Sequence, residues 1–280
     1  MNKSISTDLI KNFENYLIEE EKAYATQEKY IRDIKAFSDW TKGETLDKRK
    51  VLAYKEYLKS KFAPSSVNSV LSSLNSFFEF NNWYELKVKT LKIQKQIFAQ
   101  KDKELTKDEY ERLLEAAKKK SNERLYLLMQ TICSSGIRVS ELQYITVEAI
   151  NQKRANINLK GKMRVVILPK KLCKTLLKYT KEQKITSGPV FVTKTGKPLD
   201  RSTIWKMMKR LCESAHVLKE KVFPHNLRHL FARTYYSIQK DIVRLADILG
   251  HSSVNTTRIY TMETGDIHRR QIQSLGLLRL

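Results

Sequence analysis

Residues 105–119 read LTKDEYERLLEAAKK, and this stretch decides how the 280-residue chain divides. Thr106 is placed to cap a helix, and Glu109, three residues later, completes the capping-box pattern of a helix start. The preceding stretch, residues 85–103, is basic and only weakly patterned. We therefore predict that 85–103 is an interdomain linker and that a second domain spans residues 104–280.

Upstream of the linker, residues 1–84 carry four stretches in which apolar residues recur with helical spacing. Thr26 is predicted as the N-cap of the second helix, and Pro64 suits the first turn of the fourth. Residues 1–84 are therefore predicted to form a small helical bundle. The first and third helices are expected at 8–20 and 47–60.

The second domain is predicted to be mostly helical as well. Helices are expected at 106–120 and 122–135, with a break at Gly136. Apolar and polar residues alternate over 154–168 about a Lys-Gly-Lys turn, which predicts a pair of strands. Helical patterns then return to the end of the chain. The expected fold class is mainly α, with a small β-hairpin in the second domain.

Net charge is the strongest signal in the composition. The chain carries +23, and residues 1–100 hold 17 Lys/Arg against 13 Asp/Glu, so +19 of the total lies after residue 100. A domain this basic usually binds a polyanion. The alternative is a lysine-rich chain whose charges are simply solvated.

Several other classes of protein lack support in the sequence. No stretch approaches the roughly 18 uncharged apolar residues of a membrane span. The N-terminus carries acids early and does not resemble a signal peptide, so a cytoplasmic protein is expected. No phosphate-binding loop, HExxH pattern or Cys/His zinc spacing is present, so neither a nucleotide cofactor nor a metal is expected. The three cysteines are expected to be reduced thiols.

A set of cationic, imidazole and phenol side chains lies at the ends of the predicted elements. Guanidinium groups neutralise the non-bridging oxygens of a phosphodiester as charge builds up during attack. A tyrosine can hold the phosphoryl group covalently, and a lysine or histidine can protonate the leaving oxygen. The candidates are Arg138 after Gly136, Lys160 in the hairpin turn, His225 and Arg228 at helical spacing, His251 after Gly250, and Tyr260.

These residues resemble the motifs of the tyrosine recombinases, close to the Xer and phage-integrase type. The resemblance extends across most of the chain. It implies that residues 1–84 are a helical core-binding domain and that 104–280 are the catalytic domain, together forming a C-shaped clamp around duplex DNA. The motifs occur in the family's order as Gly136-Ile137-Arg138-Val139-Ser140-Glu141, Lys160, His225-Asn226-Leu227-Arg228, Leu249-Gly250-His251 and Tyr260.

The resemblance also implies the central chemical roles. Tyr260 is expected to attack the scissile phosphate and form a 3′-phosphotyrosine link, while Arg138 and Arg228 hold the phosphoryl oxygens. Lys160 is expected to protonate the departing 5′ oxygen. The covalent link keeps the bond energy, so the resemblance implies no cofactor.

The remaining motif residues are expected to assist. The resemblance implies that His225 transfers a proton at the tyrosine and that His251 hydrogen-bonds the phosphate. Glu141 is expected to support the first arginine from behind, and His229 is a candidate supporting residue.

Some assignments stay open at this point. The hairpin is one residue shorter than the common family form, so Lys162 is a rival for the catalytic lysine. Tyr235 and Tyr236 are rival nucleophiles, although their place in an apolar helix favours packing. Arg138 considered alone also fits an ordinary arginine at a helix end.

The partners follow from the same resemblance. The expected substrate is duplex DNA with a specific recombination site, on which four copies assemble across two sites. The segment 266–280, DIHRRQIQSLGLLRL, either folds back on its own domain or docks on a neighbouring copy. A second recombinase or an accessory protein is a further candidate partner. The expected role is dimer resolution, or integration and excision of a mobile element. A type IB topoisomerase-like enzyme and a non-catalytic DNA-binding or architectural protein are the alternatives.

Overall fold

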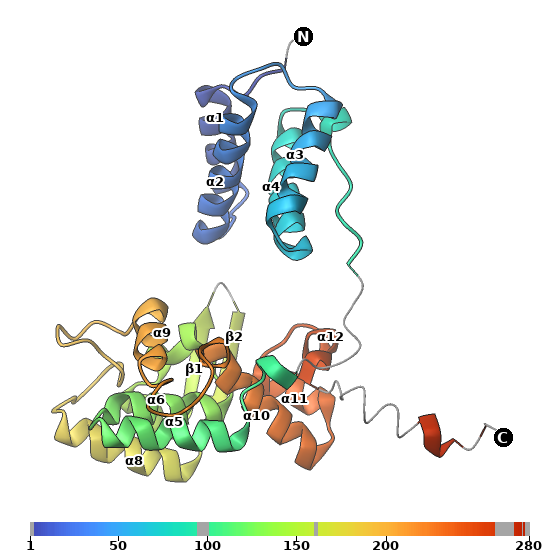
Figure 1. Cartoon of the computed structure of the whole chain (residues 1–280). Coiled ribbons are helices and arrows are strands. Elements are labelled where there is room, and N and C mark those ends of the chain that lie inside the picture. Colours follow the sequence, from blue (N-terminus) through green and yellow to red (C-terminus); the bar gives the residue numbers. More distant parts are fainter. Residues whose placement is uncertain (1–2, 94–100, 160–161, 261–271, 276, 278–280) are drawn as a thin grey trace. The chain divides into compact units, whose positions relative to one another are not determined.

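The computed structural model describes residues 3–93, 101–159, 162–260, 272–275 and 277. The chain divides into two compact units, Met1–Lys95 and Gln96–Leu280 (Figure 1). The described fold is mainly helical with one two-stranded sheet, which confirms the predicted class. None of the described helices combines the length and the apolar character that a membrane crossing requires.

The first unit contains a bundle of four helices, α1 (Thr7–Glu19), α2 (Tyr24–Thr41), α3 (Lys48–Lys61) and α4 (Pro64–Phe80). Its core is rich in aromatic rings, and the centroids of Phe13 and Phe77 lie 5.3 Å apart with the rings edge to face. The prediction for the start of α2 is wrong, because Thr26 lies inside the first turn. The Thr26 amide already donates to Ala23 O at 2.7 Å, and no side chain caps this helix.

The chain that follows α4 remains attached to the bundle. Asn68 and Asn75 of α4 each exchange two hydrogen bonds with the backbone, at Leu91 and Val88 respectively. The amide side chains thus satisfy the backbone groups of an extended segment, which lets Val88 enter the core. The first part of the predicted 85–103 linker therefore packs on the first unit.

The second unit combines helices with a β-hairpin, one face of which enters the hydrophobic core while the other is exposed. Helix α5 (Lys107–Lys119) starts with the predicted capping box. Strands β1 (Arg154–Leu159) and β2 (Lys162–Ile167) pair antiparallel. The other helices are α6 (Glu123–Ser135), α7 (Val147–Gln152), α8 (Lys170–Glu182), α9 (Arg201–Lys209), α10 (Pro224–Gln239), α11 (Ile242–Leu249) and α12 (Val254–Thr257). Short 3-10 turns lie at Tyr84–Leu86, Lys101–Lys103, Val139–Tyr144 (η3), Lys219–Lys221 and Arg258–Tyr260.

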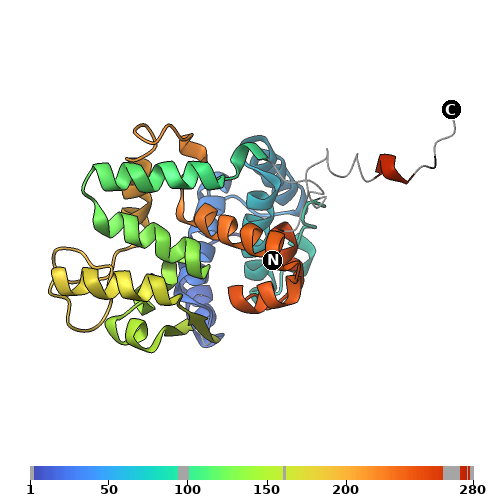
Figure 2. The same cartoon turned by 90° about the horizontal axis from the view of Figure 1, so that it is seen from below.

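Helix α10 packs against α6 and also against α11 (Figure 2). Helix α6 ends at Gly136 and α11 ends at Gly250, both in the left-handed region with φ of 65° and 63°. A Cβ at Gly136 would clash with the ring of Phe231 on α10, so glycine permits the close approach of the two helices. The last carbonyls of α6 and α11, which have no partner within their own helices, thereby meet near the start of α10.

Candidate active site

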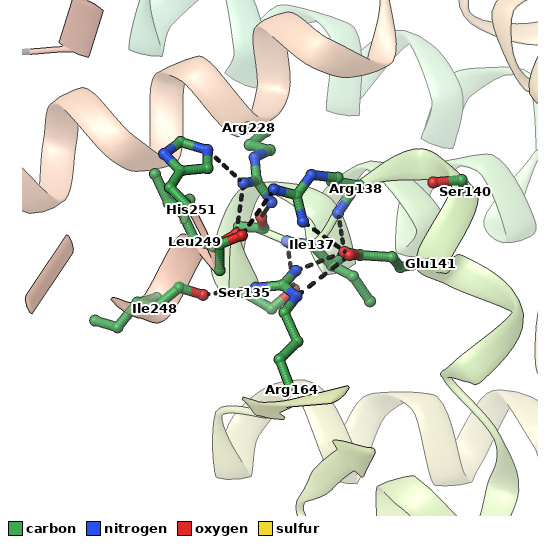
Figure 3. A network of polar contacts seen from close by, with 12 residues as sticks. Ser135, Ile137, Arg138, Ser140, Glu141, Arg164, Arg228, Ile248, Leu249 and His251 are labelled. Atoms are coloured by element: carbon green, nitrogen blue, oxygen red, sulfur yellow. Dashed lines mark hydrogen bonds and ion pairs between the residues drawn. The ribbon is translucent and has the colours of Figure 1, made fainter. Parts of the chain in front are cut away.

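Arg228, in the second turn of α10, is the buried centre of this region (Figure 3). Only 1% of its surface is exposed. Its Nη1 donates to Gly136 O at 2.6 Å and its Nη2 donates to Leu249 O at 2.7 Å, so it uses the carbonyls that end α6 and α11. Burial and then the charge of Arg138 lower the pKa of Arg228 to about 10. The guanidinium therefore stays charged at neutral pH.

Arg138 lies two residues after Gly136, the glycine that ends α6, and its side chain faces solvent. Its Nη1 donates to Glu141 Oε1 at 3.0 Å, its amide donates to Glu141 Oε2 at 2.8 Å, and its Nη2 donates to Gly250 O at 3.1 Å. The Arg138 side chain is 35% exposed and that of Glu141 is 3% exposed. Burial acts to raise the pKa of Glu141, but hydrogen bonds from Arg164 and Arg138 lower it overall. Glu141 is therefore an ionised carboxylate that holds Arg138 from behind.

Arg164 of β2 also reaches this carboxylate (Figure 3). Its Nε and Nη2 lie 3.2 and 2.5 Å from the two oxygens of Glu141, and its Nη1 donates to Ile248 O at 2.8 Å. Among the described residues, the guanidinium groups of Arg138, Arg164 and Arg228 have only Glu141 as a bonded carboxylate. This excess of positive charge favours the binding of an anion.

His251 has a defined tautomer in this arrangement. Its Nε2 lies 3.0 Å from Arg228 Nη2, and its Nδ1 lies 2.8 Å from the hydroxyl of Thr257. Arginine only donates hydrogen bonds, so Nε2 must accept and the proton of the neutral ring must be on Nδ1. Burial first, and then the charge of Arg228, lower the pKa of His251 to about 4, in agreement with a neutral ring.

Tyr260 lies between two imidazoles. Its ring centroid is 4.9 Å from that of His229, edge-on, and 6.1 Å from that of His251, in a stacked orientation. His229 in turn contacts His225 at a centroid distance of 4.4 Å. Only 4% of the Tyr260 surface is exposed, because it packs in a small apolar cluster that includes Leu249.

Both other imidazoles are also held neutral. Burial and then the charge of His225 lower the pKa of His229 to about 3. Burial and then Arg228 lower the pKa of His225. The Nε2 atom of His229 is buried and has no hydrogen-bond partner among the described residues, so none of them stabilises a proton there. The cluster therefore carries its positive charge on arginine.

A cleft of about 470 Å³ opens beside the arginines. It brings Arg138, Arg228 and His225 to one surface, together with Arg201 and Trp205 of α9. Trp205 is 45% exposed. The cleft provides room for an extended anionic chain next to the guanidinium groups.

The contacts above join seven of the eight predicted site residues into one cluster: Arg138, Glu141, His225, Arg228, His229, His251 and Tyr260. Lys160 lies outside the described residues, and its rival Lys162 is the first residue of β2. The rival nucleophile Tyr235 contacts the Phe231 ring, and Lys240 lies over the ring of Tyr236.

Arg164 and Thr257 were not singled out from the sequence. Arg164 lies in the stretch 154–168 predicted to form a pair of strands, but its partners are 23 and 84 residues away, so no local period reveals its contacts. Thr257, which bonds His251, sits in a polar stretch where a hydroxyl carries no distinguishing signal.

Two further observations concern cysteines and metals. Cys173 and Cys212 are buried and Cys133 is half-buried, and all three are free thiols. Within the described ranges, no group of three or more His, Cys, Asp or Glu side chains is arranged to hold a metal ion.

Comparison with known proteins identifies the family. The model of the phage integrase family matches residues 103–265, and that of the phage integrase N-terminal SAM-like domain matches residues 9–81. The tyrosine recombinase XerA of Pyrococcus horikoshii is 30% identical over 284 residues, which cover 98% of this chain and 95% of the relative.

Two solved structures share the fold. A site-specific recombinase, XerH, bound to its difH substrate has a TM-score of 0.71 and 19% identity, covering 99% of this chain and 85% of that one. A lambda integrase tetramer bound to a Holliday junction has a TM-score of 0.76 and 18% identity, covering 92% and 77%. The family matches favour a recombinase over a topoisomerase-like enzyme or a binding-only protein. The chain belongs to the phage integrase family and is a tyrosine-type site-specific DNA recombinase of the Xer kind.

Proposed function

We propose that Tyr260 is the nucleophile of this recombinase and that Arg138 and Arg228 bind the phosphate it attacks. The observation that carries the proposal is the charge balance, with three guanidinium groups around one carboxylate beside a tyrosine. Attack by the Tyr260 oxygen adds negative charge to the non-bridging oxygens, and guanidinium groups fixed in advance stabilise that charge. The products are a 3′-phosphotyrosine and a free 5′ hydroxyl.

The histidines handle protons in this scheme. His225, which lines the cleft with both arginines, takes the proton of the attacking tyrosine. His251 is neutral in the free protein, with Nε2 directed at Arg228. A bound phosphate adds a negative charge, which raises the pKa of His251 and lets Nε2 donate to a phosphate oxygen. His229 supports the nucleophile by packing between His225 and Tyr260.

Lys160, which lies between β1 and β2 in the sequence, donates the proton to the departing 5′ oxygen, with Lys162 as the alternative donor. The phosphotyrosine keeps the energy of the broken bond, so rejoining requires no nucleotide cofactor. The set of arginine, histidine, lysine and tyrosine also supplies charge neutralisation and proton transfer without a metal.

The burial of Tyr260 has a consequence for this reaction. With 4% of its surface exposed, the residue is shielded from a bound DNA strand. Attack therefore requires the segment that carries Tyr260 to rearrange when DNA enters the cleft. DNA binding and exposure of the nucleophile are coupled in this proposal.

The proposed substrate is duplex DNA with a specific recombination site, held by both units as a clamp. The relatives include XerH bound to difH and a lambda integrase tetramer on a Holliday junction. We infer the same assembly here, with four copies on two sites, in the cytoplasm. The C-terminal segment 268–280 docks on a neighbouring copy, and its described residues Ile272, Leu275 and Leu277 are 68%, 63% and 86% exposed. A second recombinase or an accessory protein is a further candidate partner.

A covalent-capture experiment tests the chemistry. Duplexes with randomised sequence and a nick, which lets the cleaved end diffuse away, are incubated with the protein in EDTA. Wild type is expected to give a protein–DNA adduct that survives denaturing electrophoresis, while Tyr260→Phe gives none. Tyr235→Phe and Tyr236→Phe are matched controls and are expected to retain the adduct. An adduct that persists in Tyr260→Phe, or that requires a divalent metal, contradicts the proposal.

A further inference from the structure

Arg164 connects three parts of the catalytic unit that are far apart in the sequence (Figure 3). It starts on β2, forms a two-point contact with Glu141 of η3, and donates to Ile248 O near the end of α11. Its side chain also passes over Gly250, where an added Cβ would clash with Arg164 Cδ. Glu141 and the Gly250 carbonyl are both partners of Arg138 as well. Arg164 therefore contacts the same groups that fix the phosphate-binding arginine.

The rest of β2 offers little other attachment. In the described chain this strand pairs with β1 alone. Met163, Val165 and Ile167 point away from the unit and are 80%, 58% and 79% exposed. Val166 is the strand's buried apolar side chain, at 3% exposure. Tyr144 of η3 also donates to Asn158 O of β1. Among the described residues, Arg164 is the hairpin side chain that bonds both Glu141 and the end of α11.

An arginine is required for this contact. Its planar guanidinium presents several donors in a fixed geometry, and here it bonds both carboxylate oxygens and a carbonyl at the same time. Its side chain is 13% exposed, so water competes weakly for these bonds. Lysine would keep the charge but could not reproduce the three-way contact.

We propose that Arg164 is a positioning residue that sets the β1–β2 hairpin against the phosphate site, so that protonation of the leaving 5′ oxygen from the hairpin depends on it. The inference rests on the proposed function, in which a hairpin lysine is the proton donor. Arg164 itself does not touch the reacting atoms. Its loss shifts the donor relative to the phosphate, and a shift of about 1 Å can slow a reaction on the order of 100-fold.

The chemistry of the leaving group separates this role from a general loss of structure. A substrate whose bridging 5′ oxygen is replaced by sulfur leaves as a thiolate, which needs no proton because thiols are far more acidic than alcohols. A variant that only misplaces the proton donor should be slow with oxygen and close to normal with sulfur. A variant that damages the arginine clamp should be slow with both, because the clamp acts on the non-bridging oxygens.

The experiment measures single-turnover adduct formation on both substrates, with the recombination site recovered by covalent capture. Arg164→Met and Arg164→Lys are expected to slow cleavage of the oxygen substrate on the order of 100-fold and to lose most of that deficit with sulfur. Lys160→Ala and Lys162→Ala are measured beside them, and the variant that lacks the donor lysine gives the reference pattern for a lost proton donor. Arg138→Lys marks a damaged clamp and should be slow with both substrates. Val165→Thr, on the outward face of the same strand, should match wild type.

The outcomes separate this inference from the function it rests on. Adduct formation by wild type, with Arg164 variants equally slow on oxygen and sulfur, overturns the role of Arg164 alone. Arg164 variants as fast as wild type on oxygen overturn it too. No adduct with wild type on either substrate contradicts the proposed function itself. Native gel shift and thermal melting of each variant show that the comparison is between folded, DNA-binding proteins.

Discussion

Two buried polar networks, one in each unit, differ in their balance of charge. In the first unit, Lys29 Nζ lies 2.6 Å from Asp33 Oδ2, and the hydroxyl of Ser73 donates to the same oxygen at 2.8 Å. Lys29 also donates to the Ser73 hydroxyl at 2.9 Å. Lys29 is the cation hydrogen-bonded to Asp33 and ties α2 to α4, while the Arg32 guanidinium, 75% exposed, lies 3.9 Å from the other Asp33 oxygen. This network is complete without any ligand.

The network in the second unit has more positive than negative groups. Arg138 and Arg164 bond to Glu141, and their other partners are neutral carbonyls. Arg228 bonds to two carbonyls and the imidazole of His251. Burial lowers the pKa of Arg228, and repulsion from Arg138 lowers it further. A balanced network stabilises the fold, while an unbalanced one is poised to bind an anion. The comparison therefore predicts that substitutions in the first network lower the free energy of unfolding, while substitutions in the second network slow DNA cleavage.

The largest expected effect comes from Arg228→Met. The change removes the buried cation while keeping much of the side-chain volume, so the transition state loses one of its fixed charges. Cleavage should fall by about 10²–10³-fold, the range seen when a preorganised donor to a reacting oxygen is removed. Single-turnover adduct formation on captured DNA measures this. A rate close to that of wild type would show that Arg228 is only structural.

Asp33→Ala should lower stability and leave the cleavage rate unchanged. It leaves Lys29 and Ser73 without their shared acceptor, so the free energy of unfolding of the first unit should fall by about 1–3 kcal/mol. Cleavage by the folded protein at saturating DNA should be unchanged. Denaturant unfolding followed by an aromatic signal of the first unit measures the loss. Asp39→Ala, at an exposed position of the same helix, is the matched control and should change stability by less than about 0.5 kcal/mol.

The smallest expected effect is a difference in pH dependence between the units. All five histidines lie between residues 216 and 268, so the first unit has none. His229 and His251 have folded-state pKa values lowered to about 3 and about 4 from an ordinary value of 6.5. As the pH falls below 6.5, the unfolded chain binds protons that the folded site excludes, so the second unit loses stability. Above that pH this contribution is constant.

Denaturant unfolding at pH 7 and pH 5 tests whether the stability of the second unit depends on pH more than that of the first. Each excluded proton contributes at most about 1.4 kcal/mol per pH unit. His229→Asn should weaken the dependence of the second unit, while His216→Asn, at an exposed position, should leave it unchanged. A first unit that loses as much stability as the second over this interval would contradict the role of the histidines.

The sequence predicts much of the site because its residues lie next to helix ends or repeat with helical spacing, and both patterns are visible within a few residues. Arg138 and His251 follow glycines that end helices, and His225 and Arg228 share a helical face at the start of α10. The hairpin and the capping box of α5 follow from alternation and spacing in the same way.

The features that were missed depend on contacts distant in the sequence. Arg164 acquires its meaning only when β2 lies beside α11, and the sequence pattern shows it simply as one more basic residue. The attachment of residues 88–91 to α4 requires two asparagines whose partners are 13 and 23 residues away. The start of α2 was misplaced because threonine is a good cap in general, while here the preceding turn already closes on Ala23.

The central claim is that Tyr260 becomes covalently attached to DNA in the arginine-lined site. The most direct measurement is to digest the captured adduct with nuclease and protease and to identify the modified peptide by mass spectrometry. The account predicts a nucleotide remnant on Tyr260, linked through a 3′ phosphate. A remnant on Tyr235 or Tyr236, or one linked through a 5′ phosphate, would contradict it.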